Sequence, residues 1–275
     1  MLRELCALLL SRASGTAKRL GHDREAVSIA ARYRRCRAAW TPHLEATKAL
    51  VLEAAEACPR REVALVLGSG LCLDVPVEAL AARFATVVLV DAHQPRSTRT
   101  RVRSLPNVRL VEADLTGLAR AVIETVRSKK ASLPDVPLPD LACGLRPDFT
   151  ASVNLASQLP LPLAKLLGRR FPEAQLARLG ARIVEAHFAA LARLPGRVCL
   201  ACDVAWERIE EGKVVESRDA LSGARRPRPE RVWTWDIAPR PEESFSHDRR
   251  NLVHGWLDFA AAWRAGPGAV AEGAA

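Results

Sequence analysis

Apolar runs alternate with helical patterns from residue 62 onward. The segments "VALVLGS" (63–69), "TVVLVDAH" (86–93) and "NVRLVEAD" (107–114) are rich in apolar residues, which is typical of strands buried on both faces of a sheet. The stretches "PVEALAARF" and "LTGLARAVIETVRSKK" repeat apolar residues at helical spacing and follow the first and third runs. This alternation predicts an α/β fold, doubly wound, with a mostly parallel sheet and helices on both faces.

The pattern continues beyond a proline-bearing loop. The remaining predicted elements are a fourth strand within "DFTASVNLASQLP" (148–160), a long helix over 172–194, a fifth strand "RVCLACDV" (197–204), an antiparallel hairpin over 205–221 that turns at Glu211-Gly212, and a late strand "RVWTWDIAP" (231–239). His247 and His254 are then expected on a loop and a helix, without a metal role.

The pattern also divides the chain into three parts. Residues 1–57 show helical spacing without any strand, so we expect a helical N-terminal cap over 1–57 and a sheet domain over 58–264. Thr41-Pro42 is expected to start one of the cap helices, as N-cap and first helical residue. The last segment, "AGPGAVAEGAA" (265–275), has the composition of a disordered tail.

Composition adds few constraints. A chain of 275 residues with 49% hydrophobic content can bury a full core, and no apolar run approaches the ~20 residues needed to span a bilayer, so we expect a cytoplasmic protein. The net charge of +10 comes mainly from arginines interleaved with acidic residues, which defines no clean basic face. Cys199 and Cys202 form a C-x-x-C in an apolar strand without a second ligand pair, so buried reduced thiols are expected and no metal site.

The ends of the predicted strands carry the candidate chemistry. Gly68 and Gly70 follow the first strand, where a glycine turn lets a ligand approach the backbone of a doubly wound sheet. Asp91 ends the second strand 21 positions after Gly70, the spacing of an acid that accepts hydrogen bonds from a ribose diol. Asp114 ends the third strand and could accept from an adenine amine beside Leu115. Alternatively, each acid caps a helix or lies in a solvated loop.

These segments resemble the class I S-adenosylmethionine-dependent methyltransferases over about 62–235, through "VLGSG", "VVLVDAH", "VRLVEAD" and "SVNLASQLP". The chain also resembles bacterial members of that superfamily with a helical N-terminal cap. The resemblance implies a seven-stranded Rossmann-like sheet, with "RVWTWDIAP" as its antiparallel final strand. By position, it implies these contacts with the cofactor: Gly68, Ser69 and Gly70 at the methionine part, Asp91 at the ribose, Asp114 and Leu115 at the adenine, and Asn154 at the end of the fourth strand.

The chain departs from the family pattern in two places. Apolar Val66 and Leu67 replace the usual acid ahead of the glycines, and Cys72 replaces the third glycine. Asp74, just downstream, could replace some of the contacts with the methionine part.

Other residues are candidates for the methyl acceptor. Asn154, Ser157 and Gln158 follow the fourth strand, although they could simply form the turn before the next proline. His93 could stack near the adenosine or act on substrate, and a surface histidine is the simpler interpretation. Asp203 ends the predicted fifth strand and is either a pocket residue or a turn former.

Three functions remain open from the sequence. The first is a methyltransferase that transfers a methyl group in line to a small molecule, a protein or RNA, with a base required only if the acceptor must lose a proton. The second is a nicotinamide-dependent oxidoreductase, which shares the glycine turn and Asp91 but lacks a Tyr-x-x-x-Lys pair, since Tyr33 is the only tyrosine. The third is a non-catalytic cofactor-fold protein that binds RNA or a protein partner.

Overall fold

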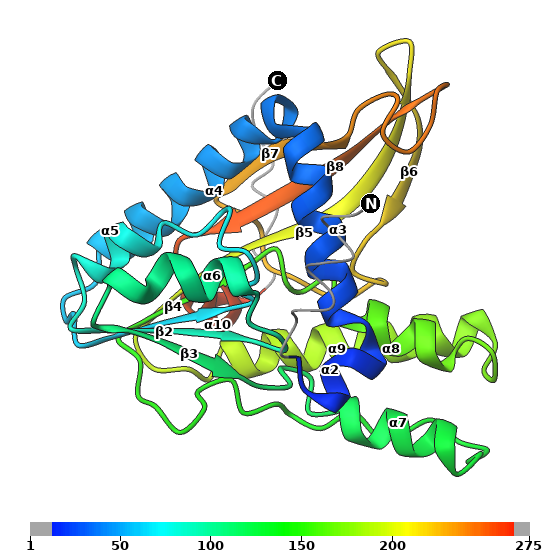
Figure 1. Cartoon of the computed structure of the whole chain (residues 1–275), viewed down its shortest axis with the longest axis horizontal. Coiled ribbons are helices and arrows are strands. Elements are labelled where there is room, and N and C mark those ends of the chain that lie inside the picture. The colour runs from blue at the N-terminus through cyan, green and yellow to red at the C-terminus, as the bar shows by residue number, and fades with distance from the viewer. Residues whose placement is uncertain (1–12, 267–275) are drawn as a thin grey trace.

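The computed structural model describes residues 13–266 as a central sheet with helices on both faces (Figure 1). The strands are β1 (Val63–Leu67), β2 (Thr86–Asp91), β3 (Val108–Glu112), β4 (Phe149–Val153), β5 (Arg197–Glu210), β6 (Lys213–Asp219), β7 (Arg231–Ala238) and β8 (Asp248–Trp256). The helices are α2 (Gly15–Leu20), α3 (His22–Arg35), α4 (Arg37–Glu56), α5 (Val77–Ala81), α6 (Arg96–Arg101), the 3-10 helix η1 (Val102–Ser104), α7 (Ala119–Arg127), α8 (Pro160–Leu167), α9 (Glu173–Leu191) and α10 (Phe259–Ala265). The predicted tail lies almost entirely outside the described residues.

The strand order is β3-β2-β1-β4-β5-β8-β7, and β6 pairs with β5 beside this path. Strands β1 to β5 are parallel, whereas β8 is antiparallel to both β5 and β7. The predicted fold class is therefore confirmed, with an eighth strand added by the hairpin. That hairpin turns at Glu211 and Gly212, whose φ values of 50° and 78° match the left-handed positions of a tight hairpin turn.

The C-terminal strands correct one expectation. Strand β7, which covers "RVWTWDIA", runs in the same direction as β5, because both are antiparallel to β8. The antiparallel strand is β8, so His254 lies in a strand and not in a helix. The sequence "DRRNLVHGW" is polar for half of its length, and pairing with neighbours on both sides supplies the regularity that its pattern lacks.

Helix α4 also begins earlier than expected. It starts at Arg37, so Pro42 lies inside the helix and Thr41 donates its side-chain hydroxyl to the Arg37 carbonyl at 2.9 Å. Tertiary packing accounts for the extra turn: Trp40 is only 2% exposed and its indole N–H donates to the Ile237 carbonyl on β7 at 3.0 Å. This packing holds α4 against the C-terminal strands.

The core lies on both faces of the sheet. Alternate residues of the parallel strands enter two different clusters, so that Leu65 packs on the α7–α9 side and Val66 on the α4–α5 side. Cys199 and Cys202 are both buried, and they also lie in opposite clusters. Because they face opposite sides of the sheet, they cannot share a metal ion.

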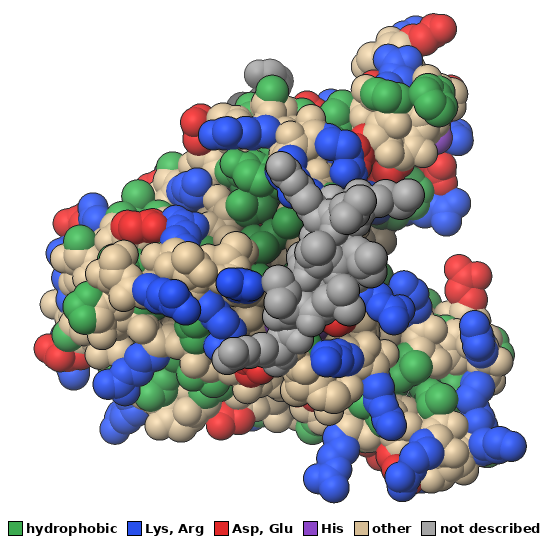
Figure 2. Space-filling view, viewed as in Figure 1, with side chains coloured by type: hydrophobic (Ala, Val, Ile, Leu, Met, Phe, Trp, Pro, Cys, Tyr) green, Lys and Arg blue, Asp and Glu red, His purple; other side chains and the backbone are tan. Residues whose placement is uncertain are grey.

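One face of the molecule carries charges of both signs. Basic and acidic side chains are interspersed over the face in Figure 2, and Lys and Arg are most frequent around α7 and α8. Within residues 13–266, no helix combines the length and the hydropathy needed to cross a bilayer.

Candidate functional site

The glycine turn follows β1 directly. Gly68 and Gly70 have φ values of 74° and 42°, in the left-handed region that favours glycine. The N–H groups of Gly68 and Ser69 donate to the Val90 carbonyl at 2.9 and 3.2 Å, which holds the turn against β2. A Cβ atom at Gly68 would lie 2.9 Å from the Cβ of Leu155, so this glycine is required by close packing.

Asp91 lies at the end of β2 and contacts the glycine turn, as the spacing predicts. Its Oδ2 accepts from the Gly70 N–H at 2.8 Å and its Oδ1 from the His93 N–H at 3.1 Å. Desolvation raises the pKa of this partly exposed carboxyl, and the two backbone bonds oppose the rise. A carboxylate offers about four acceptor positions, so about two remain free for a vicinal diol.

Asp114 is held by its own turn. Its Oδ1 accepts from the Thr116 N–H at 2.9 Å and from the Thr116 hydroxyl at 2.6 Å, and its Oδ2 accepts from the Ala119 N–H at 2.7 Å. These bonds start α7, which supports the helix-capping interpretation of this acid. Leu115 is 5% exposed and belongs to the core. The adenine contacts of both residues remain a prediction.

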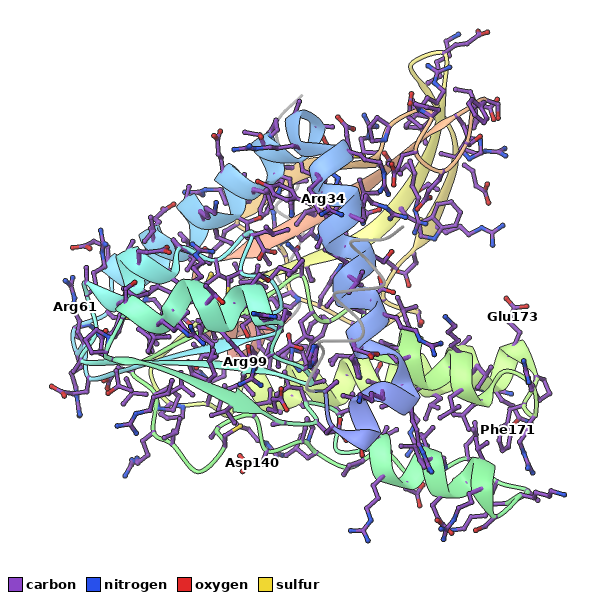
Figure 3. All side chains as sticks on the ribbon, viewed as in Figure 1. Arg34, Arg61, Arg99, Asp140, Phe171 and Glu173 are labelled. Carbon is purple, nitrogen blue, oxygen red and sulfur yellow. The ribbon has the colours of Figure 1, made fainter. Side chains whose placement is uncertain are left out.

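His93 is buried, at 6% exposed, so its interpretation as a surface histidine is wrong. Its Nδ1 lies 3.8 Å from Glu112, which also pairs with Arg99 at 2.8 Å. Arg99 is labelled on α6 in Figure 3. The neighbouring Gln94 donates a hydrogen bond from its Nε2 to the hydroxyl of Ser69 at 3.2 Å. These polar side chains, which lie near the carboxyl ends of β2 and β3, therefore support the glycine turn after β1.

Helix α3 brings a residue that the sequence analysis missed. His22, the first residue of α3, interacts electrostatically with Asp91, Asp114 and His93. Burial lowers its pKa, and the two carboxylates oppose that effect. The N-terminal helices thus lie beside the carboxyl ends of β2 and β3, as Figure 1 also shows for α2 and α3.

A second polar cluster lies at the end of β4. Asn154 follows that strand with a left-handed φ of 47° and is 6% exposed. Its Nδ2 position lies 2.7 Å from Asp74 Oδ2 and 3.0 Å from His43 Nε2. The indole N–H of Trp233 on β7 donates to His43 Nδ1 at 3.0 Å. These contacts connect α4, the glycine loop, β4 and β7.

The positions of the protons in this series of hydrogen bonds follow from the chemistry of its members. An indole N–H only donates, so His43 Nδ1 accepts and the neutral ring carries its proton on Nε2. The Asn154 atom that faces Nε2 must then be the amide oxygen, which a 180° rotation of the amide places there. The same oxygen faces Asp74, so Asp74 must carry a proton and donate it. Burial raises the pKa of Asp74, in agreement with this assignment.

Asp203 lies next to this cluster. It is inside β5, which continues to Glu210, so its interpretation as a turn former is wrong. The Ser157 hydroxyl donates to its Oδ2 at 3.4 Å, and the Asn251 side chain on β8 also interacts with the carboxylate. Burial raises the pKa of Asp203 to about 6.

The remaining candidate, Gln158, has a structural role, as do His187 and Trp235. Gln158 lies partly exposed in the turn before α8, and its backbone N–H donates to the Leu155 carbonyl at 2.9 Å. His187 is fully buried, pairs with the Ser152 hydroxyl at 3.0 Å, and has its pKa lowered by burial to about 3. Trp235 stacks on His43 with ring centroids 4.2 Å apart.

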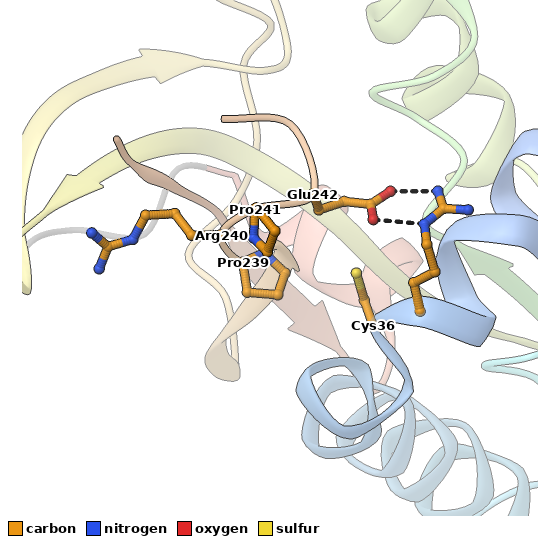
Figure 4. Close-up of a pocket in the computed structure, with 6 residues that line it drawn as sticks. Cys36, Pro239, Arg240, Pro241 and Glu242 are labelled. Carbon is orange, nitrogen blue, oxygen red and sulfur yellow. Dashed lines mark hydrogen bonds and ion pairs between the residues drawn. The ribbon is translucent and has the colours of Figure 1, made fainter. Parts of the chain in front are cut away.

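The structure also contains a cavity of about 460 Å³ away from these residues (Figure 4). It lies between the α3–α4 junction and the loop after β7, and is lined by Arg35, Cys36, Pro239, Arg240, Pro241 and Glu242. Glu242 accepts from Arg35 Nε at 2.8 Å and from its Nη2 at 2.6 Å, so an ion pair forms part of the wall. None of the predicted site residues lines this cavity.

Three residues of the second cluster were missed by the sequence analysis. His43 lies in a helical segment among apolar residues, and Asn251 lies in the strand that was not predicted. Trp233 lies in a strand that the sequence predicts, but no role was assigned to it. No local pattern identifies these residues, because their contacts join segments far apart in the sequence.

Known proteins offer limited guidance: no family model matches the chain, and no curated protein matches it. Among solved structures, a complex of DhpI with SAH is 15% identical over 82% of this chain and 93% of that one, with a TM-score of 0.39. The Burkholderia thailandensis 1,6-didemethyltoxoflavin-N1-methyltransferase is 16% identical over 83% and 86%, with a TM-score of 0.34. A chain from a complex of the Haloferax volcanii Trm112 methyltransferase activator with a methyltransferase is 12% identical, with a TM-score of 0.32. The present chain spans 55% of that last protein, and the match covers 58% of the present chain.

Proposed function

We propose that the protein is an S-adenosylmethionine-dependent methyltransferase. The observation that carries the proposal is the 2.8 Å hydrogen bond between Gly70 and Asp91 at the carboxyl ends of β1 and β2. It places a left-handed glycine turn beside an acid with free acceptor positions. In open α/β sheets, ligands bind outside the carboxyl ends of the strands, where the strand order reverses. Here that point lies between β1 and β4.

The residues present fit an adenosine. Asp91 would accept hydrogen bonds from the ribose hydroxyls while it keeps the Gly70 N–H. Asp114 has about one acceptor position left for the adenine amine, since three are used within its turn. Leu155 fills the space beside Gly68, so Gly70 is the glycine that offers a close backbone approach. The methionine part would therefore lie toward Gly70 and Asp74.

The cofactor would supply an activated methyl group bonded to a sulfonium. The tasks left to the chain are to position the acceptor and to exclude water. The cluster of His43, Asn154 and Asp203 lies on the β4–β5 side of the same edge and would hold the acceptor. The N-terminal helices α2, α3 and α4 would serve as the cap of the site.

The sheet favours this function over nicotinamide chemistry. A dinucleotide-binding sheet continues with parallel strands in the order 3-2-1-4-5-6. In this protein the antiparallel β8 separates β5 from β7. The acceptor, whether a small molecule, a protein or RNA, is not defined by these features.

Isothermal titration with S-adenosylmethionine and S-adenosylhomocysteine tests the proposal. We expect binding by the wild-type protein and at least tenfold weaker binding by Asp91→Asn, which removes the charge and two acceptor positions. Glu112→Gln is the matched control, because Glu112 is paired in register with Asp91 but engages Arg99. Equal affinity of Asp91→Asn and the wild type would reject the site, and binding of NADH alone would favour the oxidoreductase.

A further inference from the structure

Four buried polar atoms without a hydrogen-bond partner lie beneath α4. They are the free amide position of Asn154, Oδ1 of Asp203, Nε1 of Trp235 and Oδ1 of Asn251. Each of these residues is at most 7% exposed. A buried polar group without a partner costs about 1–3 kcal/mol, and native proteins contain few of them. Four in one place indicate that a polar partner belongs there.

The strand register places these residues on one face. Asp203 lies opposite Val253, and Trp235 lies opposite Asn251. Residues directly opposite each other in antiparallel strands point to the same face, as do residues two apart on one strand. Asp203, Trp235 and Asn251 therefore share the face that α4 covers, and α4 contacts β5, β7 and β8.

Helix α4 closes the cluster from above. The His43 ring stacks on Trp235 and bonds Asn154, which follows β4. The Ser157 hydroxyl and the Asn251 side chain both interact with the Asp203 carboxylate. Oδ1 of Asp203 and Oδ1 of Asn251 nevertheless have no hydrogen-bond partner. We refer to Asp203, Asn251 and Ser157 as the Asp203 site.

The charge and hydrogen-bonding character of the Asp203 site define its ligand. The free oxygens of Asp203 and Asn251 only accept, so the ligand must bring N–H or O–H donors. Asp203 is negative when ionised, whereas the neighbouring Asp74 carries a proton and adds no charge. The opposing cation, Arg249 of β8, is shared with Glu243 at 3.5 Å and with the Trp206 ring at 5.3 Å. A protonated amine supplies both the positive charge and several donors.

We propose that the Asp203 site binds the amino group of the methyl acceptor and that Asp203 takes its proton. This inference rests on the proposed function. One N–H bond of the ammonium breaks and its proton moves to Oδ1 of Asp203. The freed nitrogen lone pair then forms the bond to the methyl carbon, while the electron pair of the carbon–sulfur bond stays on sulfur. Since the free oxygens of Asp203 and Asn251 each need a donor, the ammonium carries at least two N–H bonds. The acceptor is thus a primary or secondary amine, and Asn154 and Trp235 bind its other polar atoms.

Amine binding is measured first, without cofactor. Thermal shift and titration calorimetry at pH 8 compare methylamine, ethanolamine, benzylamine and spermidine with the matching alcohols. We expect at least one amine to bind the wild-type protein at least tenfold more tightly than its alcohol. Asp203→Asn should lose that preference. Asp236→Asn is the matched control, since Asp236 is an exposed acid on β7, and it should behave as the wild type.

Methyl transfer to the bound amine is then followed by mass spectrometry with S-adenosylmethionine. Asp203→Asn should bind the cofactor with wild-type affinity but lose at least 100-fold in turnover, as expected for loss of a general base. If the wild type fails to bind the cofactor, the proposed function fails while the amine result still stands. If the cofactor binds but no amine is preferred, or Asp203→Asn keeps the preference, the Asp203 site is wrongly assigned.

Discussion

Replacing Asp203 with asparagine should stabilise the protein, and increasingly so as the pH rises. Burial raises the pKa of Asp203 from 3.8 to about 6, so the folded protein keeps this proton to a higher pH than the unfolded chain. The ionised carboxylate therefore opposes folding. The effect is small below pH 4, grows as the pH passes through 6, and is complete above about pH 7.

The magnitude follows from the change in pKa. At about 1.4 kcal/mol per pKa unit, the ionised Asp203 side chain costs about 3 kcal/mol at pH 8. At pH 5 the folded protein still holds the proton, and the cost is about 1.5 kcal/mol. Asparagine has nearly the same shape and can still accept from the Ser157 hydroxyl. The variant should thus gain about 3 kcal/mol at pH 8 and about half as much at pH 5.

Urea denaturation followed by circular dichroism at both pH values measures these differences. The slope of the unfolding free energy against urea should be unchanged, since the surface exposed on unfolding is the same. Asp236→Asn, which replaces an exposed acid on β7, is the matched control for the removal of a carboxylate. A gain for Asp203→Asn that does not grow with pH, or a loss of stability at pH 8, would refute the burial of an ionised carboxylate at this position.

Three further predictions concern the turn and the histidines. Gly68→Ala should lower the free energy of unfolding, measured by urea denaturation, by about 2–4 kcal/mol, because φ is left-handed there and Leu155 lies 2.9 Å from the new Cβ. Gly21 also has a left-handed φ, but the space around it is open. Gly21→Ala should therefore cost only about 1 kcal/mol in the same assay. Phenylalanine at Trp233 removes the donor to His43 Nδ1, so nitrogen NMR should show a change in the tautomer of His43, and an unchanged spectrum would contradict the hydrogen-bond directions. His187, whose pKa burial lowers to about 3, should remain neutral to pH 4 in an NMR titration, and a midpoint near 6.5 would contradict its burial.

The half of the site around Asp91 could be predicted from the sequence. Continuous apolar runs identify strands buried on both faces, and parallel neighbours bring their carboxyl ends to one edge. The contact between Gly70 and Asp91 follows from that arrangement, because β1 and β2 pair in register over five residues. The capping role of Asp114 could not be separated from ligand binding, since both uses place a carboxylate after a strand.

The missed elements share a physical cause. Helix α6, within "PRSTRTRVRSL", has few apolar residues, so periodicity cannot reveal it. Strand β8 contains charged residues along its first half, and hydrogen bonds from both neighbours stabilise it. The early start of α4 depends on Trp40, whose indole bonds β7. In each case tertiary contacts override a weak local pattern.

The half of the candidate site around His43 is built from segments that are far apart in the sequence. His43 and Asn154 are 111 positions apart, and 190 positions separate His43 from Trp233. Their contacts exist only because α4 crosses the sheet above β5, β7 and β8. The proposed adenosine side is thus encoded in neighbouring strands, whereas the proposed acceptor side is assembled from the N-terminal helices and the C-terminal strands. Changes in α4 or β8 can therefore alter the acceptor chosen while the turn at Gly70 and Asp91 stays intact, and the specificity of the protein should be sought in those two elements.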